Sequence, residues 1–305
     1  MSDYGCMASR CLQKIVQTPE HQRFSVLGEG LELLADNVAT LDEDVSTLGE
    51  SRRDRGAAVL RCFADEEAAK ILILLDLARA GWTDDAVVKK CVKNFYTHLA
   101  RCLYVRAYSG APADLAEVRD YVDQLRQEHY LDGPMEVDWI FDNEVLTSRE
   151  GRLYVDYVQD EGGGLRWAGP AEQAAMYDEP FDHPSPSSVV VQLVAAMRHI
   201  GLLTEDGLAA IRAVWDNVAV DDTLHWMELR PLNLEVVERL AVNRRYVDEG
   251  HAAVRFVVDH WLFPMTNLNL TMVKVSVADL KRKQERWLAN QMGVDVENDS
   301  VDYHM

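Results

Sequence analysis

The chain has 305 residues, a net charge of −20 and no charge-free apolar run long enough to cross a membrane. Its 48% hydrophobic and 27% charged residues are typical of a soluble globular protein. The excess of acidic residues argues against a broad polyanion-binding surface, so nucleic acid could bind only at a local basic patch. Five cysteines without a CxxC pair, and an N-terminus without a secretory signal, indicate a cytoplasmic protein with reduced thiols.

Helical periodicity dominates the first part of the chain. Apolar residues recur at spacings of three and four between residues 24 and 48, which predicts an amphipathic helix. A second helix is predicted from the capping residue Ser51 to about Ala80, with a stop at Gly81. A third is predicted over 83–108 and a fourth over 113–129. Four helices joined by short connections predict an up-and-down bundle.

One segment carries a clear strand signal. Apolar residues alternate before and after a Gly-rich turn, which predicts a short β-hairpin near 153–167. The proline-rich stretch 177–188 indicates a boundary between a helical domain, 1–178, and a C-terminal helical domain, 179–305, with a frayed acidic tail. In the second domain, helices are predicted at about 187–200, 204–219, 233–260 and 278–292. The fold class is therefore mainly α, with one hairpin.

The second predicted helix is apolar on nearly every side, yet it carries Glu66, Glu67 and Lys70 near its middle. A helix of this kind is normally buried, and buried charges must be paired. Lys70 follows Glu66 by four residues and Glu67 by three, so we expect both carboxylates to reach its ammonium group. These residues form either an internal ion pair that fixes helix register or the floor of a functional site.

Four blocks, in chain order, resemble a known family. They read GEGLELLADNVATLDEDVSTL, AVLRCFADEEAAK, KNFYTHLARCL and REGRLYVDYVQDEGGGLRWAGP. Together they resemble the AbiV family of abortive-infection proteins over roughly residues 24–175. That family is placed in the HEPN superfamily, whose helical members often act as ribonucleases in phage defence or in toxin–antitoxin pairs. The resemblance implies a HEPN-like bundle and says nothing about residues 180–305.

The resemblance also implies a catalytic set. HEPN ribonucleases typically carry an Arg, a polar residue and then a His four to six positions after the Arg, and the segment KNFYTH (93–98) has this shape with Lys in place of Arg. It implies His98 as general acid–base, Lys93 with Arg101 as charge for the phosphorane, and Asn94 as an orienting group. Lys is a point charge, whereas Arg offers a planar fork for two phosphate oxygens. Read without the resemblance, these residues are a solvated helix face.

Two further groups of residues need an interpretation. Arg245 and His251 satisfy the same spacing with a true Arg, but a Tyr follows that Arg and Gly250 suggests a helix break. Around the hairpin, four residues either close one wall of the site or cap the end of the bundle. They are Arg149, Arg152, Tyr154 and Asp156.

The function expected from the resemblance is metal-independent endoribonuclease activity on host or phage RNA, with no cofactor. It gives a 2′,3′-cyclic phosphate, and His98 transfers the proton. The expected partners are a second copy in a homodimer and a phage-encoded activator or a cognate antitoxin. Glu66, Glu67 and Lys70 would orient the third helix from beneath. One alternative is a non-catalytic HEPN module that sequesters a phage or host protein. Another is a nucleotidyl- or phosphate-transfer enzyme, for which no Gly-rich phosphate loop is present.

Overall fold

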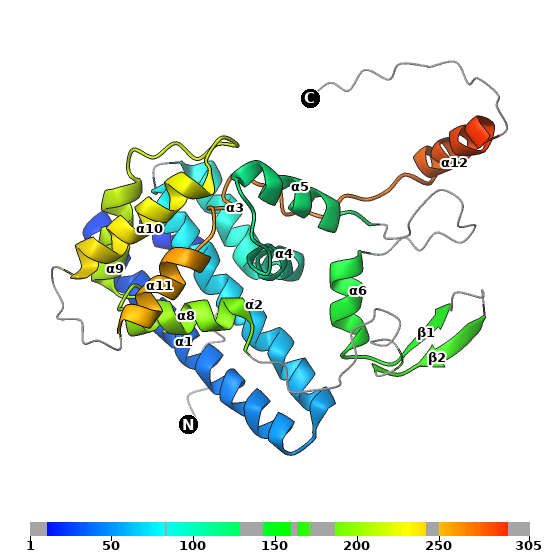
Figure 1. Cartoon of the computed structure of the whole chain (residues 1–305), viewed down its shortest axis with the longest axis horizontal. Helices are drawn as coiled ribbons and strands as arrows, with labels where there is room; N and C mark the ends of the chain where they lie inside the picture. Colours follow the sequence, from blue (N-terminus) through cyan, green and yellow to red (C-terminus); the bar gives the residue numbers. More distant parts are fainter. Residues whose placement is uncertain are drawn as a thin grey trace, which may run out of the picture.

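The computed structural model describes residues 11–82, 84–128, 143–159, 164–170, 172, 187–241 and 250–291. It is mainly helical with one antiparallel hairpin, which confirms the predicted fold class (Figure 1). Its elements are η1 (Leu12–Gln17), α1 (Glu20–Glu50), α2 (Asp54–Ala80), α3 (Asp85–Tyr96), α4 (His98–Tyr108), α5 (Leu115–Leu125), α6 (Glu144–Gly151), β1 (Asp156–Gln159), β2 (Leu165–Ala168), α8 (Val189–His199), α9 (Glu205–Trp215), α10 (Trp226–Ala241), α11 (Gly250–His260) and α12 (Val277–Gln291). None of the helices described here is both long and apolar enough to cross a membrane.

Helices α1 and α2 pack together as a long hairpin, and α2 is the buried axis of the molecule (Figure 1). Every residue from Ile71 to Arg79 is buried, as an apolar helix requires. Helix α2 ends at Gly81 as predicted, where φ is +68°. The predicted cap at Ser51 is wrong, because Ser51 closes the C-terminal end of α1 and α2 begins three residues later, at Asp54.

The predicted third helix is two helices, α3 and α4, which divide at Thr97. Thr97 is extended, and its N–H bonds the carbonyl of Asn94 at 3.1 Å instead of that of Lys93. The Thr97 hydroxyl donates to the Lys93 carbonyl at 2.8 Å, and the Arg101 guanidinium donates to carbonyls at the break. These contacts satisfy the backbone groups that a helix end exposes. His98 therefore begins α4 instead of lying in the middle of a regular helix.

Helix α6 was not predicted; it packs on α4 and brings Arg149 toward α2. The predicted hairpin is confirmed, with Tyr157 of β1 opposite Trp167 of β2. Of the predicted wall residues near the hairpin, Tyr154 lies before β1 and Asp156 is the first residue of that strand. The turn at 160–163 lies outside the described residues.

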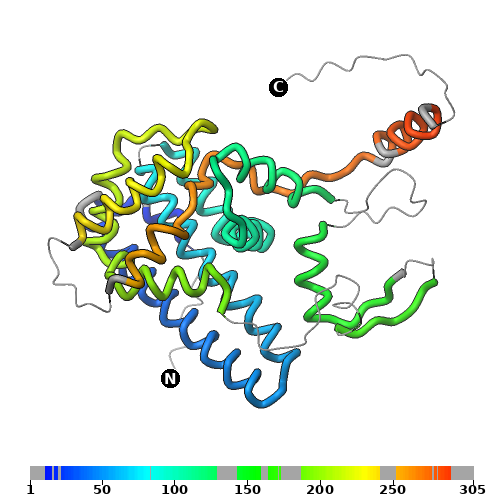
Figure 2. Tube along the Cα trace, in the orientation of Figure 1, coloured from blue at the N-terminus to red at the C-terminus, as the bar shows by residue number. Residues whose placement is uncertain are grey.

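The C-terminal helices pack directly on the N-terminal pair. Helices α8 and α9 contact both α1 and α2, while α10 packs on α9 and α11 packs on α8 (Figure 2). One hydrophobic core contains residues of all six helices. Gly28 of α1 allows the close approach of α9, because a Cβ there would lie 3.0 Å from the backbone nitrogen of Glu205. The helix predicted over 233–260 is two helices, α10 and α11. The division into domains 1–178 and 179–305 stays a prediction, and the shared core joins its two halves.

A buried ion pair, which the sequence analysis missed, fastens α2 to these C-terminal helices. Arg79 and Asp76 are fully buried, and the Arg79 guanidinium lies 3.6 Å from the ring centroid of Trp261. Arg79 also donates to Asn233 at 2.9 Å, and Asp76 accepts from the Tyr104 hydroxyl at 2.9 Å. Burial, which disfavours the charged carboxylate, raises the pKa of Asp76 to about 6.

Candidate functional site

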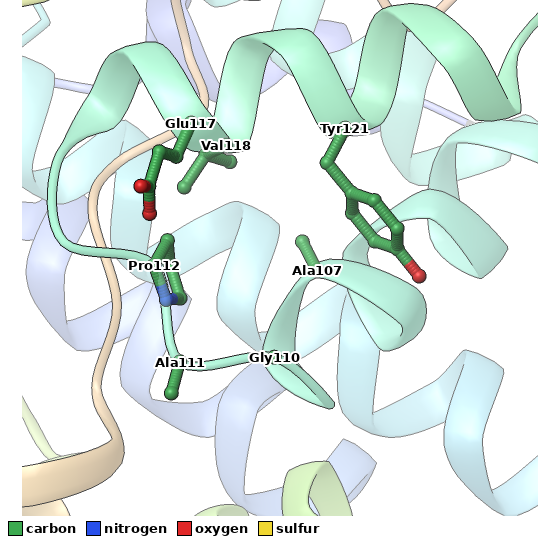
Figure 3. A pocket seen from close by; sticks show the side chains of 7 residues that line it. All are labelled: Ala107, Gly110, Ala111, Pro112, Glu117, Val118 and Tyr121. Carbon is green, nitrogen blue, oxygen red and sulfur yellow. The ribbon is translucent and has the colours of Figure 1, made fainter.

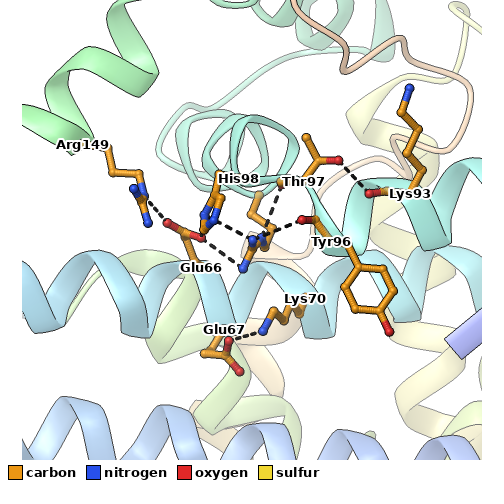
Figure 4. Close-up of polar contacts among 9 residues, drawn as sticks. Glu66, Glu67, Lys70, Lys93, Tyr96, Thr97, His98 and Arg149 are labelled. Atoms are coloured by element: carbon orange, nitrogen blue, oxygen red, sulfur yellow. Dashed lines mark hydrogen bonds and ion pairs between the residues drawn. The ribbon is translucent and has the colours of Figure 1, made fainter. Parts of the chain in front are cut away.

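Glu66 is the centre of a charge network between α2, α4 and α6 (Figure 4). Its side chain is only 4% exposed. One carboxylate oxygen, Oε2, lies 2.7 Å from His98 Nδ1 and 3.1 Å from Arg101 Nη1, and the other, Oε1, lies 2.5 Å from Arg149 Nε. Burial opposes the charge of Arg149, but the hydrogen bond and the negative charge of Glu66 outweigh it and raise the pKa of Arg149. One buried carboxylate thus holds two guanidinium groups and one imidazole.

The contact with Glu66 sets the orientation of His98. Arg101 Nη2 lies 3.2 Å from the same His98 Nδ1, but one ring nitrogen cannot donate to the carboxylate and accept from the guanidinium. The shorter contact, with Glu66, assigns the proton to Nδ1. In the neutral ring, Nε2 is then the nitrogen without a proton, and the side chain is 53% exposed. His98 is therefore fixed on one side and open to solvent on the other.

The other residues predicted for the site lie in different surroundings. Lys93 is exposed on α3, and its side chain points away from His98 (Figure 4). Asn94 is buried on the same helix. The expectation that Lys70 pairs with both carboxylates is wrong, because it bonds Glu67 alone. The helix break at Thr97 separates Lys93 and Asn94, which lie on α3, from His98 and Arg101, which lie on α4.

The four residues predicted as a site wall also lie in different surroundings. Arg149 enters the network directly through Glu66. Arg152 lies next to it at the end of α6, with its Nη1 3.6 Å from Cys62 Sγ. Tyr154 and Asp156 are exposed at the start of the hairpin. Of the alternative pair, Arg245 and the side chain of His251 lie outside the described residues.

A hollow of about 200 Å³ adjoins this network. Residues of α2, α4 and α6 line it, together with Ser188 at the start of α8. Burial and the neighbouring Glu66 charge raise the pKa of the Cys102 thiol to about 12, so this cysteine is not a nucleophile at neutral pH. The described cysteines, Cys11, Cys62, Cys91 and Cys102, are free thiols. No three His, Cys, Asp or Glu side chains gather like metal ligands in the described part of the chain.

A second hollow, of about 240 Å³, lies where α4 leads into α5 (Figure 3). It is lined mainly by small and apolar residues, with Glu117 and Tyr121 on the α5 side. The Glu117 carboxylate already accepts from the backbone N–H of Ala113 at 2.7 Å. This hollow is a cavity without a reactive group, so the Glu66 network is the better candidate for a functional site.

The family model of AbiV, a HEPN family, matches residues 26–178. The chain belongs to the AbiV family. Membership indicates an abortive-infection function of the HEPN type, and the matched segment contains Glu66, His98, Arg101 and Arg149. No curated protein and no solved structure matches the chain.

Asp65 of α2 and Arg106 of α4 also line the hollow of about 200 Å³, and neither they nor the contact of Arg149 with Glu66 were predicted from the sequence. Arg106 follows His98 by eight residues, so helical spacing could have placed it on the face of α4 that carries His98. The contact of Arg149 with Glu66 joins residues 83 positions apart, and no local pattern signals it.

Proposed function

We propose that this AbiV-family chain is a metal-independent endoribonuclease that cuts host or phage RNA during abortive infection. The observation that supports it most is the contact between buried Glu66 and half-exposed His98. A carboxylate that holds one ring nitrogen fixes the tautomer and the aim of the other, as general base catalysis requires.

In the proposed reaction, His98 Nε2 takes the proton of a ribose 2′-OH. The 2′-oxygen attacks the adjacent phosphorus, the bond from phosphorus to the 5′-oxygen breaks, and an acid returns a proton to that leaving oxygen. The products are a 2′,3′-cyclic phosphate and a 5′-hydroxyl. In the proposed homodimer, His98 of a second copy would be that acid. A phage-encoded activator or a cognate antitoxin would control the reaction.

Arginine supplies the positive charge that the phosphorane needs. Arg101 and Arg149 together outnumber the single charge of Glu66, so the network keeps an excess positive charge beside His98. His98 is also the first residue of α4, where the helix dipole favours negative charge. Arg101 therefore takes the part first expected of Lys93, and a role for Lys93 would need the second copy.

The test is cleavage of total RNA by the purified full chain, with and without EDTA. We expect His98→Ala to lower the cleavage rate by about 10²–10⁴ while the protein stays folded, because His98 is half exposed. The matched control is His225→Ala, an exposed histidine immediately before α10, which should keep the parental rate. EDTA should leave the rate unchanged, and loss restored by a divalent ion would contradict the metal-free reaction.

The second candidate is a non-catalytic module that sequesters a phage or host protein, and the hairpin favours it. Tyr157, Leu165 and Trp167 share one face, and Trp167 is 69% exposed. Exposed aromatic groups of this kind often mark protein-binding surfaces. If Trp167→Ser abolishes protection of bacteria against phage while His98→Ala does not, sequestration replaces cleavage. If only His251→Ala abolishes cleavage, the alternative Arg245 motif carries the reaction.

A further inference from the structure

The hollow of about 200 Å³ beside Glu66 is rich in groups that bind anions. Arg106 of α4 and Arg149 and Arg152 of α6 line it. Three serines, Ser109, Ser148 and Ser188, also line it. Guanidinium groups present a planar fork of donors that matches phosphate oxygens. The hydroxyls of Ser109 and Ser188 already donate to the Val105 carbonyl and to Asp65, so the arginines are the donors on which an anion would depend.

The charge around this hollow is opposite in sign to that of the whole chain. Among the described residues that line it, three are arginines, Arg106, Arg149 and Arg152, and two are carboxylates, Asp65 and Glu66. Burial, opposed by a hydrogen bond from Ser188, raises the pKa of Asp65 to about 6, so the negative charge of Asp65 is itself disfavoured. In a chain of net charge −20, this is the kind of local basic patch that an anionic ligand needs.

On the α4 side, the residues that line the hollow lie on the same face of the helix as His98, which does not itself line it. Cys102, Arg106 and Ser109 follow His98 at spacings of four, four and three, which places them on the same side of the helix. Since an α-helix rises about 1.5 Å per residue, Arg106 lies roughly 12 Å along the axis from His98. Glu66 borders both regions, because one of its oxygens contacts His98 and the other contacts Arg149.

We infer that this hollow is a phosphate-binding subsite. Within the proposed function, on which this assignment of the source rests, its ligand is a backbone phosphate flanking the one cleaved at His98. A short oligonucleotide can bridge the two positions, and holding the flanking phosphate would fix the strand against the imidazole. Free phosphate presents the same oxygens, so the test must separate the two sources.

The test uses the full chain and two probes. A fluorescent single-stranded 2′-O-methyl RNA, which cannot be cleaved, is titrated by anisotropy at several salt concentrations. Inorganic phosphate is followed by its effect on the melting temperature, against chloride at equal ionic strength. The variants are Arg106→Gln and Arg152→Gln, so that one remains if the other does not fold. The control is Arg119→Gln, which removes an exposed charge on α5 that pairs with Asp222.

We expect each pocket variant to weaken RNA binding by about tenfold or more and to lower the salt slope by roughly 0.7, the value for one lost phosphate contact. The phosphate-induced rise in melting temperature should disappear in the pocket variants and persist in Arg119→Gln. If only the inorganic phosphate effect disappears, the subsite stands and its ligand is free phosphate. If neither probe distinguishes the pocket variants from the control, the subsite is refuted.

These outcomes are independent of the catalytic proposal. If phosphate binding is lost in the variants but the parent cleaves no RNA, the proposed function fails and the subsite stands. If the parent cleaves RNA and both pocket variants bind and cleave like the parent, the subsite fails and the proposed function stands.

Discussion

The substitution Glu66→Gln tests the centre of the network most directly. It removes one negative charge from a side chain that is 4% exposed, and it leaves the Arg101 and Arg149 side chains, 9% and 13% exposed, without their carboxylate. Removing one partner of a buried ion pair costs about 3–5 kcal/mol. At roughly 2–3 °C per kcal/mol for a protein of this size, the melting temperature should fall on the order of 10 °C.

The matched control is Glu67→Gln, the same change at the next residue of α2. Glu67 and its partner Lys70 are each 18% exposed, and the pair lies three residues apart on one helix. Such a pair contributes about 1 kcal/mol or less, so the melting temperature should fall by roughly 2 °C. The assay is a thermal melt of both variants in the same buffer.

Catalysis supplies a second readout that a purely structural role would leave unchanged. A Gln amide can donate to His98 Nδ1 and favour the tautomer whose Nε2 carries the proton, which cannot act as a base. We therefore expect Glu66→Gln to lower the cleavage rate by about 10²–10⁴, and Glu66→Asp, which keeps the charge, to restore part of it. Equal melting temperatures and equal rates for Glu66→Gln and Glu67→Gln would refute the network.

Three further predictions follow from other parts of the molecule. Arg79→Met should lower the free energy of unfolding by about 3–5 kcal/mol, because it leaves Asp76 buried without its cation. The control Arg230→Met breaks an exposed ion pair and should lower it by about 1 kcal/mol or less, so equal losses in denaturant titrations would contradict this prediction. Burial raises the pKa of Asp65 from 3.8 to about 6, so the folded state loses stability as pH rises through that range. Between pH 4 and pH 7 the stability of Asp65→Asn should therefore rise by up to about 3 kcal/mol relative to that of the parent, and a stability difference that does not change with pH would refute the raised pKa. Light scattering at micromolar concentration should give the mass of a homodimer, and a monomer mass would count against the shared site.

The sequence correctly predicted the elements that are determined by interactions between residues close together in the chain. The apolar periodicity of α1 and α2, the stop at Gly81 and the alternation in the hairpin all appear in the structure. The division of the third helix does not follow from a glycine or proline. It depends on Arg101, which contacts both the break and Glu66 of another helix, and such long-range contacts are invisible in a helical pattern.

The charges of α2 illustrate the same limit. Helical spacing correctly predicted that Glu67 and Lys70 meet, but it also assigned Glu66 to Lys70, because spacing describes only neighbours on one helix. The actual partners of Glu66 lie up to 83 residues further along the chain. A signal for Asp76 and Arg79 was present, since opposite charges three residues apart interrupt the run ILILLDLAR. Of the ion pairs between residues that the structure describes, Asp76–Arg79 is the one with both side chains fully buried.

At position 93 this chain has Lys where the motif has Arg, and guanidinium groups from elsewhere in the fold lie near His98 instead. The motif implied by the family resemblance has its guanidinium four to six residues before the histidine. This chain has Lys93 five residues before His98, and Lys93 points away from the imidazole (Figure 4). Guanidinium groups reach the same region from α4 and α6, through Arg101 and Arg149, and Glu66 holds both. Because Glu66 is a buried residue of α2, a helix that packs in the core, the position of His98 depends on the core and not on a surface loop. In the proposed reaction, the fold thus supplies through long-range contacts the charge that the short motif lacks.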